Sequence, residues 1–318
     1  MKIRILFASD IHASEITFRK FLNAYRIYKA DYLVYGGDLT GKAVVPIFRV
    51  ENHRYKATFL NQNIEIDETN LGNLLSKIAN AGYYGFVTDK SEWDNLINNP
   101  EKLQKVLIDL MVDRVQNWLN LIEEKLPEMK GKGRIFIIPG NDDTYEIDKL
   151  LNNSEFVINP DGKVVNLDGE HEMLGISNAN ITPWKCYRDI EEKEIEKKID
   201  NLASKITSLN KSIFLIHVPP FNSNIDMAPK LDEHFRPEVS PMGGIVTVPV
   251  GSISVRTAIE KYQPMLGLHG HIHESRGAIK IGKTLCINPG SEYGEGILRA
   301  AIIDIKEDKV KDYVFISS

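Results

Sequence analysis

The sequence contains little cysteine, no excess of basic residues and no long apolar run. Cys186 and Cys286 are the two cysteines among 318 residues, and neither has a partner at the spacing of a redox motif or a metal site. Such sparse cysteine excludes a scaffold stabilised by disulfides and is typical of a reducing compartment. We therefore expect a cytoplasmic protein.

Charge and hydropathy exclude further classes. Lys and Arg number 39 against 44 Asp and Glu, a net charge of −5, which argues against a protein that wraps extended nucleic acid. No run approaches the ~18 apolar residues of a membrane span, and the apolar stretch 3–8 is too short for a signal peptide, so we expect no membrane association. The length favours one large domain with an insertion, or two domains.

Short apolar runs alternate with a helical pattern. Residues 3–8 and 31–35 read as buried strands, and residues 15–29 between them carry aromatic and apolar side chains at helical spacing. This strand, helix, strand order predicts parallel pairing in an α/β fold. Further strand-like runs lie at 134–138, 213–216, 265–268, 284–287, 298–305 and 313–316.

The alternation is interrupted between residues 42 and 133. Residues 44–66 resemble a hairpin, and two helical stretches follow, the second long and with Pro100 near its first turn. We interpret 42–133 as an inserted lid of a hairpin and helices, over or beside the functional site of a single domain that spans 1–318.

Polar side chains follow five of the predicted strands. Open α/β sheets bind ligands at the carboxyl ends of their strands, so these side chains should lie close together. Asp10 with His12, and His271 with His273, have the i, i+2 spacing that in an extended segment directs both side chains to one side, toward a pair of metal ions. A carboxylate such as Asp38 bridges two cations through its two oxygens, and Asn141 offers a neutral oxygen.

Taken together, these segments resemble the calcineurin-like metallophosphoesterases, which are binuclear metal hydrolases. The matching pieces, in the order of that family, are Asp10-Ile11-His12, Gly37-Asp38, Gly140-Asn141, His217 and Gly270-His271-Ile272-His273. The resemblance implies a first metal held by Asp10, His12, Asp38 and His273, and a second held by Asp38, Asn141, His217 and His271. It also implies a four-layer α/β/β/α sandwich of two mixed sheets, with the insertion at 42–133.

The activity implied by the resemblance is metal-dependent hydrolysis of a small phosphoester. A hydroxide that bridges two divalent metals would attack phosphorus in line. Imidazole and oxygen donors without thiolate favour Mn, Fe, Ni or Zn, and do not distinguish among them. Asp143 either orients a metal ligand from behind or caps the following helix.

The chain departs from the family pattern after Asn141. The family carries a His there as transition-state stabiliser or general acid, whereas this chain has Asp142. His269, which shares the i, i+2 spacing with His271, and His234, in a loop-like stretch, are alternative acids. Two divalent cations, two carboxylates and a hydroxide sum to about +1, which an ionised Asp142 would cancel. This arithmetic disfavours dianionic monoesters and predicts a phosphodiesterase.

Two alternatives stay open on sequence. A phosphomonoesterase or protein phosphatase would use the same metals, and a non-catalytic scaffold would use the same fold. The presence of all seven candidate ligands argues against the scaffold, because members of a hydrolase fold that have lost activity typically also lack metal ligands. The sequence does not predict an oligomeric state.

Overall fold

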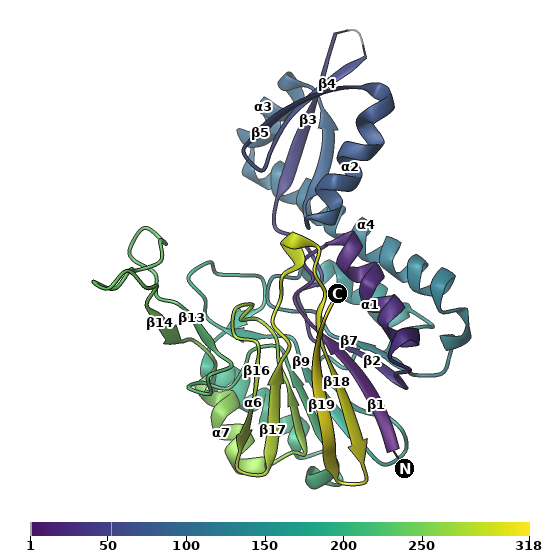
Figure 1. The fold of residues 1–318 in the computed structure, drawn as a ribbon, viewed down its shortest axis with the longest axis vertical. Helices are drawn as coiled ribbons and strands as arrows, with labels where there is room; N and C mark the ends of the chain where they lie inside the picture. Colours follow the sequence, from purple (N-terminus) through teal and green to yellow (C-terminus); the bar gives the residue numbers. More distant parts are fainter. Residues whose placement is uncertain (1, 52) are drawn as a thin grey trace.

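A five-stranded mixed sheet forms one half of the protein, which we describe from a computed structural model over residues 2–51 and 53–318 (Figure 1). Its strand order is β19-β18-β1-β2-β7. The strands are β1 (Lys2–Ala8), β2 (Tyr32–Tyr35), β7 (Ile135–Ile137), β18 (Arg299–Lys306) and β19 (Lys309–Ser317). Because β1, β2 and β7 are parallel, their carboxyl ends lie at the same edge of the sheet.

A second, six-stranded sheet has the order β16-β17-β15-β12-β9-β8. Its strands are β8 (Val164–Asn166), β9 (Glu172–Ile176), β12 (Ile213–Ile216), β15 (Leu266–Leu268), β16 (Gly277–Ile281) and β17 (Thr284–Asn288). The four central strands are parallel, and the edge strands β8 and β16 are antiparallel to their neighbours. The two short pairs outside the main sheets are β10 (Ala179–Asn180) with β11 (Asp189–Ile190), and β13 (Met227–Pro229) with β14 (Thr247–Pro249).

Alternation along the strands separates the two faces of each sheet. In β1, Ile5 and Phe7 point into the core between the sheets, whereas Leu6 and Ala8 point toward the outer helices. On the second sheet Leu215 faces inward and Phe214 faces the helices of the other side. The sheets therefore pack on each other through one core and are covered by helices through two more.

Five helices flank or cover the sheets: α1 (Glu15–Ile27), α4 (Pro100–Lys125), α5 (Asp148–Asn153), α6 (Glu192–Ala203) and α7 (Ile253–Tyr262). Residues of α1, α4 and α5 join the core outside the first sheet, and residues of α6 and α7 join the core outside the second. Phe18 of α1 stacks on Trp118 of α4, with ring centroids 3.9 Å apart. The predicted four-layer sandwich of two mixed sheets is confirmed.

The insertion builds a small sheet of its own, which projects from the sandwich in Figure 1. Its elements are β3 (Val44–Val50), β4 (Arg54–Phe59), β5 (Gln62–Asp67), β6 (Tyr84–Thr88), α2 (Leu71–Asn80) and α3 (Lys90–Ile97). Ile47, Phe59 and Ile78 are buried in its separate core. The segment thus holds a four-stranded sheet rather than a hairpin, and three helices rather than two. The C-terminal half of α4 packs into the main core, so residues 42–133 do not stand apart from the sandwich as a whole.

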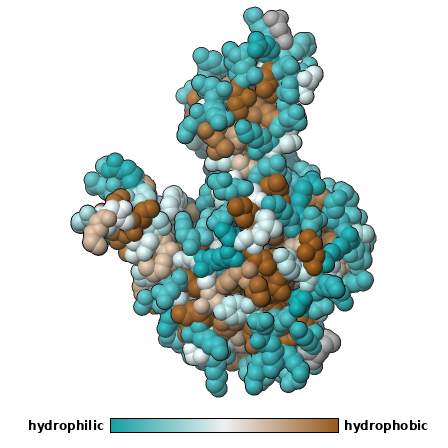
Figure 2. Space-filling model, in the orientation of Figure 1, coloured by the Kyte–Doolittle hydropathy of each residue, from teal (hydrophilic) through white to brown (hydrophobic). Residues whose placement is uncertain are grey.

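A second projection lies between β13 and β14. Figure 2 shows apolar side chains at its surface, and Phe235, Val239, Met242 and Ile245 are its exposed apolar residues. Among the helices of residues 2–51 and 53–318, none combines the length and apolar character needed to cross a bilayer.

Candidate metal centre

The carboxyl ends of strands from both sheets converge on one cluster of Asp and His side chains. Possible donor atoms of Asp10, His12, Asp38 and His273 all lie within 4.8 Å of one another. Those of Asp38, His217 and His271 form a second such group. We call the two groups together the Asp38 cluster, because Asp38 belongs to both.

Left-handed backbone shapes the loops of this cluster. Asp10, His12, Asp38 and His271 have φ of 57°, 42°, 56° and 67°, a region that residues other than glycine rarely adopt. The extended geometry that we predicted from the i, i+2 spacing is therefore wrong for these loops, because each strand ends before its ligand residues. Such unusual conformations gather at functional sites, where the surrounding contacts hold them in place.

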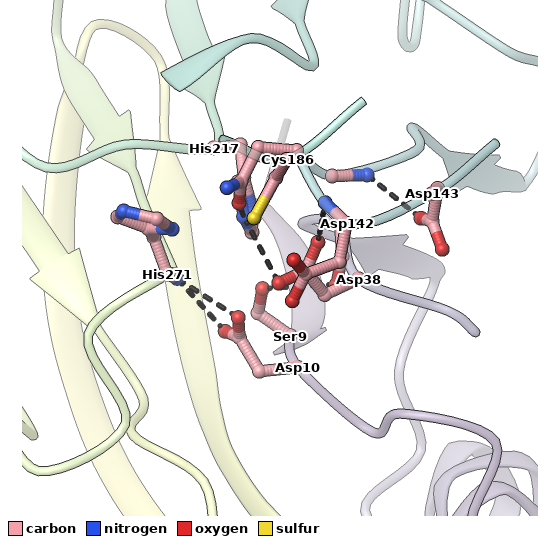
Figure 3. A network of polar contacts seen from close by, with 12 residues as sticks. Ser9, Asp10, Asp38, Asp142, Asp143, Cys186, His217 and His271 are labelled. Atoms are coloured by element: carbon pink, nitrogen blue, oxygen red, sulfur yellow. Dashed lines mark hydrogen bonds and ion pairs between the residues drawn. The ribbon is translucent and has the colours of Figure 1, made fainter. Parts of the chain in front are cut away.

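Two glycines let the loops approach each other closely. A Cβ atom on Gly37, whose φ is 113°, would lie 2.4 Å from Nδ1 of His217. A Cβ atom on Gly270 would lie 2.3 Å from Oδ2 of Asp10, and the next amide, that of His271, donates to both oxygens of Asp10. Figure 3 shows the backbone amide of His271 directed at the carboxylate of Asp10, with His217 and Asp38 nearby.

Backbone carbonyls orient two of the imidazoles. Nδ1 of His217 lies 2.8 Å from the carbonyl oxygen of Gly36, and Nδ1 of His12 lies 3.1 Å from that of Thr40. A carbonyl oxygen only accepts hydrogen bonds, so each ring carries its hydrogen on Nδ1, which donates to the carbonyl, and presents Nε2 as a donor atom for a metal. Nε2 of His12 lies 3.0 Å from Nε2 of His273, so the two rings converge on one point.

Asn141 is oriented by a carboxylate that the sequence did not reveal. Its amide nitrogen Nδ2 donates to Oδ1 of Asp189 over 2.9 Å, which turns Oδ1 of Asn141 toward Nε2 of His217, 3.0 Å away. Asp189 lies in β11, just before α6 begins at Glu192. A charged residue outside any motif gives no signal of this role.

The donor set fits divalent cations. The Asp38 cluster combines imidazole nitrogens with carboxylate and amide oxygens, which suits Mn, Fe, Ni or Zn. Burial and the neighbouring Asp142 raise the pKa of Asp38 to about 7. A cation beside this carboxylate would offset that penalty, since positive charge favours the ionised form.

Comparison with known proteins gives one sequence relative and several structures of the same fold. No family model matches the chain. MJ1162, an uncharacterised protein of Methanocaldococcus jannaschii, is 34% identical over 169 residues, which are 52% of this chain and 68% of that protein. One crystal structure aligns with 98% of each chain at 15% identity and a TM-score of 0.60. TT1561 of Thermus thermophilus aligns with 100% of this chain and 99% of its own at 14% identity and a TM-score of 0.51.

The chain belongs to the same family as MJ1162 and has the calcineurin-like metallophosphoesterase fold. In this metallophosphoesterase fold the seven predicted ligands lie together, although they come from five separate segments of the sequence.

Asp143 ties two loops of the candidate metal centre together. Its buried carboxylate accepts hydrogen bonds from the amides of Leu39, Thr40 and Gly140 and from the hydroxyl of Thr40, over 2.6–2.9 Å. The loops it joins carry Asp38 and Asn141. The structure thus places Asp143 behind the ligands, and the turn that follows has Thr144 at its N-cap position instead.

Asp142, at the position of the family's His, is paired with Lys42. Its carboxylate contacts the Lys42 ammonium and lies 4.0 Å from Nδ1 of His12, while its backbone amide donates to Oδ1 of Asp38 over 3.0 Å. Burial opposes ionisation, but His12 and Lys42 together hold the pKa of Asp142 well below its usual range. The contact with Lys42 favours the ionised form of Asp142, and an ionised carboxylate has no proton to donate. No sequence pattern indicated a role for Lys42, although it follows Asp38 by only four residues.

The two alternative acids lie outside the Asp38 cluster. His269 is fully buried, and its Nδ1 lies 2.9 Å from the carbonyl of Ile216 and 3.2 Å from that of Val218. The prediction that His269 shares a side with His271 is wrong, because the left-handed turn at His271 redirects the chain. His234 is exposed on the projection between β13 and β14, where it contacts Glu233.

Proposed function

We propose that this protein is a metal-dependent phosphoester hydrolase that acts on a small substrate and prefers phosphodiesters. One observation carries the proposal: the two donor groups of the Asp38 cluster share Asp38 and are drawn from both sheets. Donor groups that share one carboxylate are what a pair of adjacent cations requires.

The residues of the chain divide the work as follows. One cation would be held by Asp10, His12, Asp38 and His273, and the other by Asp38, Asn141, His217 and His271. When bound, the cations supply Lewis-acid activation of water and of the phosphoryl oxygens. The carbonyl of Gly36 and the carboxylate of Asp189 hold His217 and Asn141 in the orientation that presents their donor atoms.

The preference for diesters rests on Asp142. The carboxylate offers no proton to a departing oxygen, so substrates with weakly basic leaving groups, such as aryl esters, should react best. Together with Lys42 it forms a pair of zero net charge, where an imidazolium would add a positive charge. The pair therefore adds no net positive charge to match the second negative charge of a monoester.

Phosphomonoester hydrolysis is the second candidate, and Lys42 favours it. The charge sum that predicted a diesterase counted Asp142 alone, whereas the Lys42 ammonium offsets that carboxylate at short range. A site with this cation repels a dianion less than the sequence suggested.

The test is a comparison of aryl esters on protein purified without chelator. We expect Mn to support hydrolysis of bis(4-nitrophenyl) phosphate faster than of 4-nitrophenyl phosphate, and Asp38→Asn to lower both rates by about a thousandfold. Asp142→His should raise the ratio of monoester to diester turnover; an unchanged ratio would refute the electrostatic basis of the preference. Less than one metal per chain, with no hydrolysis after Mn addition, would favour a non-catalytic scaffold.

A further inference from the structure

Lys42 lies where the sandwich passes into the insertion, next to the metal site. Just before it, the amide of Gly41 donates to the hydroxyl of Tyr84 in β6 over 2.9 Å. Gly82, which precedes β6, packs so closely on the site that a Cβ atom there would lie 2.4 Å from the carbonyl oxygen of His12 and 2.8 Å from the ring of Tyr293. The base of the insertion is thus fixed against a loop that carries a ligand, and this fixes the backbone of Lys42.

The side chain of Lys42 reaches from solvent to a buried carboxylate. Lys42 is 57% exposed, whereas its partner Asp142 is 9% exposed. The amide of Asp142 in turn binds Asp38, which is common to both donor groups. The Lys42 side chain therefore lies at the rim of the Asp38 cluster, between a buried carboxylate and solvent.

This placement leaves Lys42 able to bind an anion. An ammonium has three N–H groups, so contact with one carboxylate leaves donor capacity on the solvent side. Without Lys42, the Asp142 carboxylate would repel an anionic ligand at the cluster; with it, the pair is neutral and offers N–H donors.

We propose that Lys42 binds a non-bridging oxygen of the phosphoryl group, with Asp142 as the residue that positions it. The inference rests on the proposed function, because it assigns a substrate contact at that site. It makes the insertion part of the substrate site through its first residue, and it gives Asp142 a role other than that of an acid.

The experiment measures binding of inorganic phosphate to the Mn-loaded full chain by calorimetry, so it does not depend on turnover. We expect Lys42→Gln to weaken binding about tenfold or more, and Lys42→Arg to stay within about threefold of the wild type. Asp142→Asn removes the residue that positions Lys42 and should weaken binding, but less than Lys42→Gln does. The double variant should bind phosphate more tightly than Lys42→Gln, because it lacks the carboxylate that repels the anion. Lys130→Gln is the matched control. Lys130 is 55% exposed, like Lys42, and its ammonium lies 2.8 Å from the carboxylate of Glu155. This pair is remote from the Asp38 cluster.

The order of affinities separates this role from a structural ion pair. If Lys42→Gln binds phosphate like the wild type, if both single variants weaken binding equally, or if the wild type binds no phosphate, the inference is overturned. Melting temperatures show whether a variant is folded, and Lys42→Arg tests the charge should Lys42→Gln unfold. Phosphate binding that depends on Lys42, without hydrolysis of any ester, would support the inference and refute the proposed function. Ester hydrolysis together with wild-type phosphate binding by Lys42→Gln would support the proposed function and refute the inference.

Discussion

The amide nitrogen of Asn141 donates to the carboxylate of Asp189, and this one contact decides which end of the Asn141 side chain faces the metal site. An amide rotated by half a turn would present N–H groups, which do not bind a cation. Asp189 is itself held by the amides of Thr182 and Cys186 and by the hydroxyl of Thr182. The loop around residues 182–189 therefore serves a ligand that belongs to a different loop.

Replacing Asp189 by Asn should weaken metal binding. The new amide no longer enforces the orientation of Asn141, so we expect Mn affinity to fall by about tenfold to a hundredfold. Competition with a chromophoric chelator measures the affinity. Asp200→Asn is a suitable control, because Asp200 binds Tyr262 and Lys261 on the outer face of the second sheet. Unchanged affinity in a folded Asp189→Asn protein would contradict this role.

Replacing Asp143 by Asn should destabilise the chain even without metal. Four donors point at the buried carboxylate, and an amide nitrogen would face some of them, so the free energy of unfolding should fall by about 2–4 kcal/mol. Urea denaturation in the presence of a chelator measures this loss apart from any contribution of bound metal. Exposed Asp308 provides the control, and Asp308→Asn should change stability by less than about 0.5 kcal/mol. Equal stability of the two variants would show that the hydrogen bonds to Asp143 do not stabilise the fold.

A methyl group at Gly270 should disturb the metal site, whereas one at Gly72 should not. The added Cβ atom at position 270 would lie 2.0 Å from Oγ of Ser9 and 2.3 Å from Oδ2 of Asp10, so we expect Gly270→Ala to lose at least about tenfold in Mn affinity. Gly72 lies in α2 with no atom within 4 Å of its added Cβ atom, and Gly72→Ala should stabilise the helix by about 0.5 kcal/mol. Similar Mn affinities in the two variants would show that the close approach at Gly270 is unimportant.

Stability should fall in acid through Asp304. Its carboxylate binds Arg4 over 2.7 Å and Lys2 over 2.9 Å, and the hydrogen bond from Arg4 lowers the pKa of Asp304 to about 2. Because the pKa of Asp304 is lower in the folded chain than in the unfolded chain, where it is about 4, ionised Asp304 stabilises the fold at pH values above about 4. This contribution is lost as the pH falls toward 2. Asp304→Asn should therefore cost about 1 kcal/mol at pH 7 and almost nothing at pH 2. A difference between wild type and variant that stays constant across this range would rule out the pair as its source.

The sequence predicted eight strands of the two main sheets but missed β8, β9 and β16. The seven candidate ligands followed from the residues after those strands and from the family resemblance. Apolar runs predict buried strands, and the candidate ligands follow those runs closely. Local sequence patterns were therefore enough to find them. The break in the alternation of strands and helices located the insertion. The fold of the insertion could not be predicted, because no sequence pattern shows which of its strands pair or where its helices pack. Helix α4 also contributes residues to two different cores.

Only the tertiary structure decided what surrounds the ligands. The left-handed turn at His271 removed His269 from the site, since the chain there is not extended. Asp189 and Lys42 reach Asn141 and Asp142 across 48 and 100 residues of sequence, a separation at which spacing predicts nothing. The candidate ligands are recognisable because they follow the ends of strands that the sequence predicts, whereas a supporting charge acts through space and can come from any segment that folds beside it.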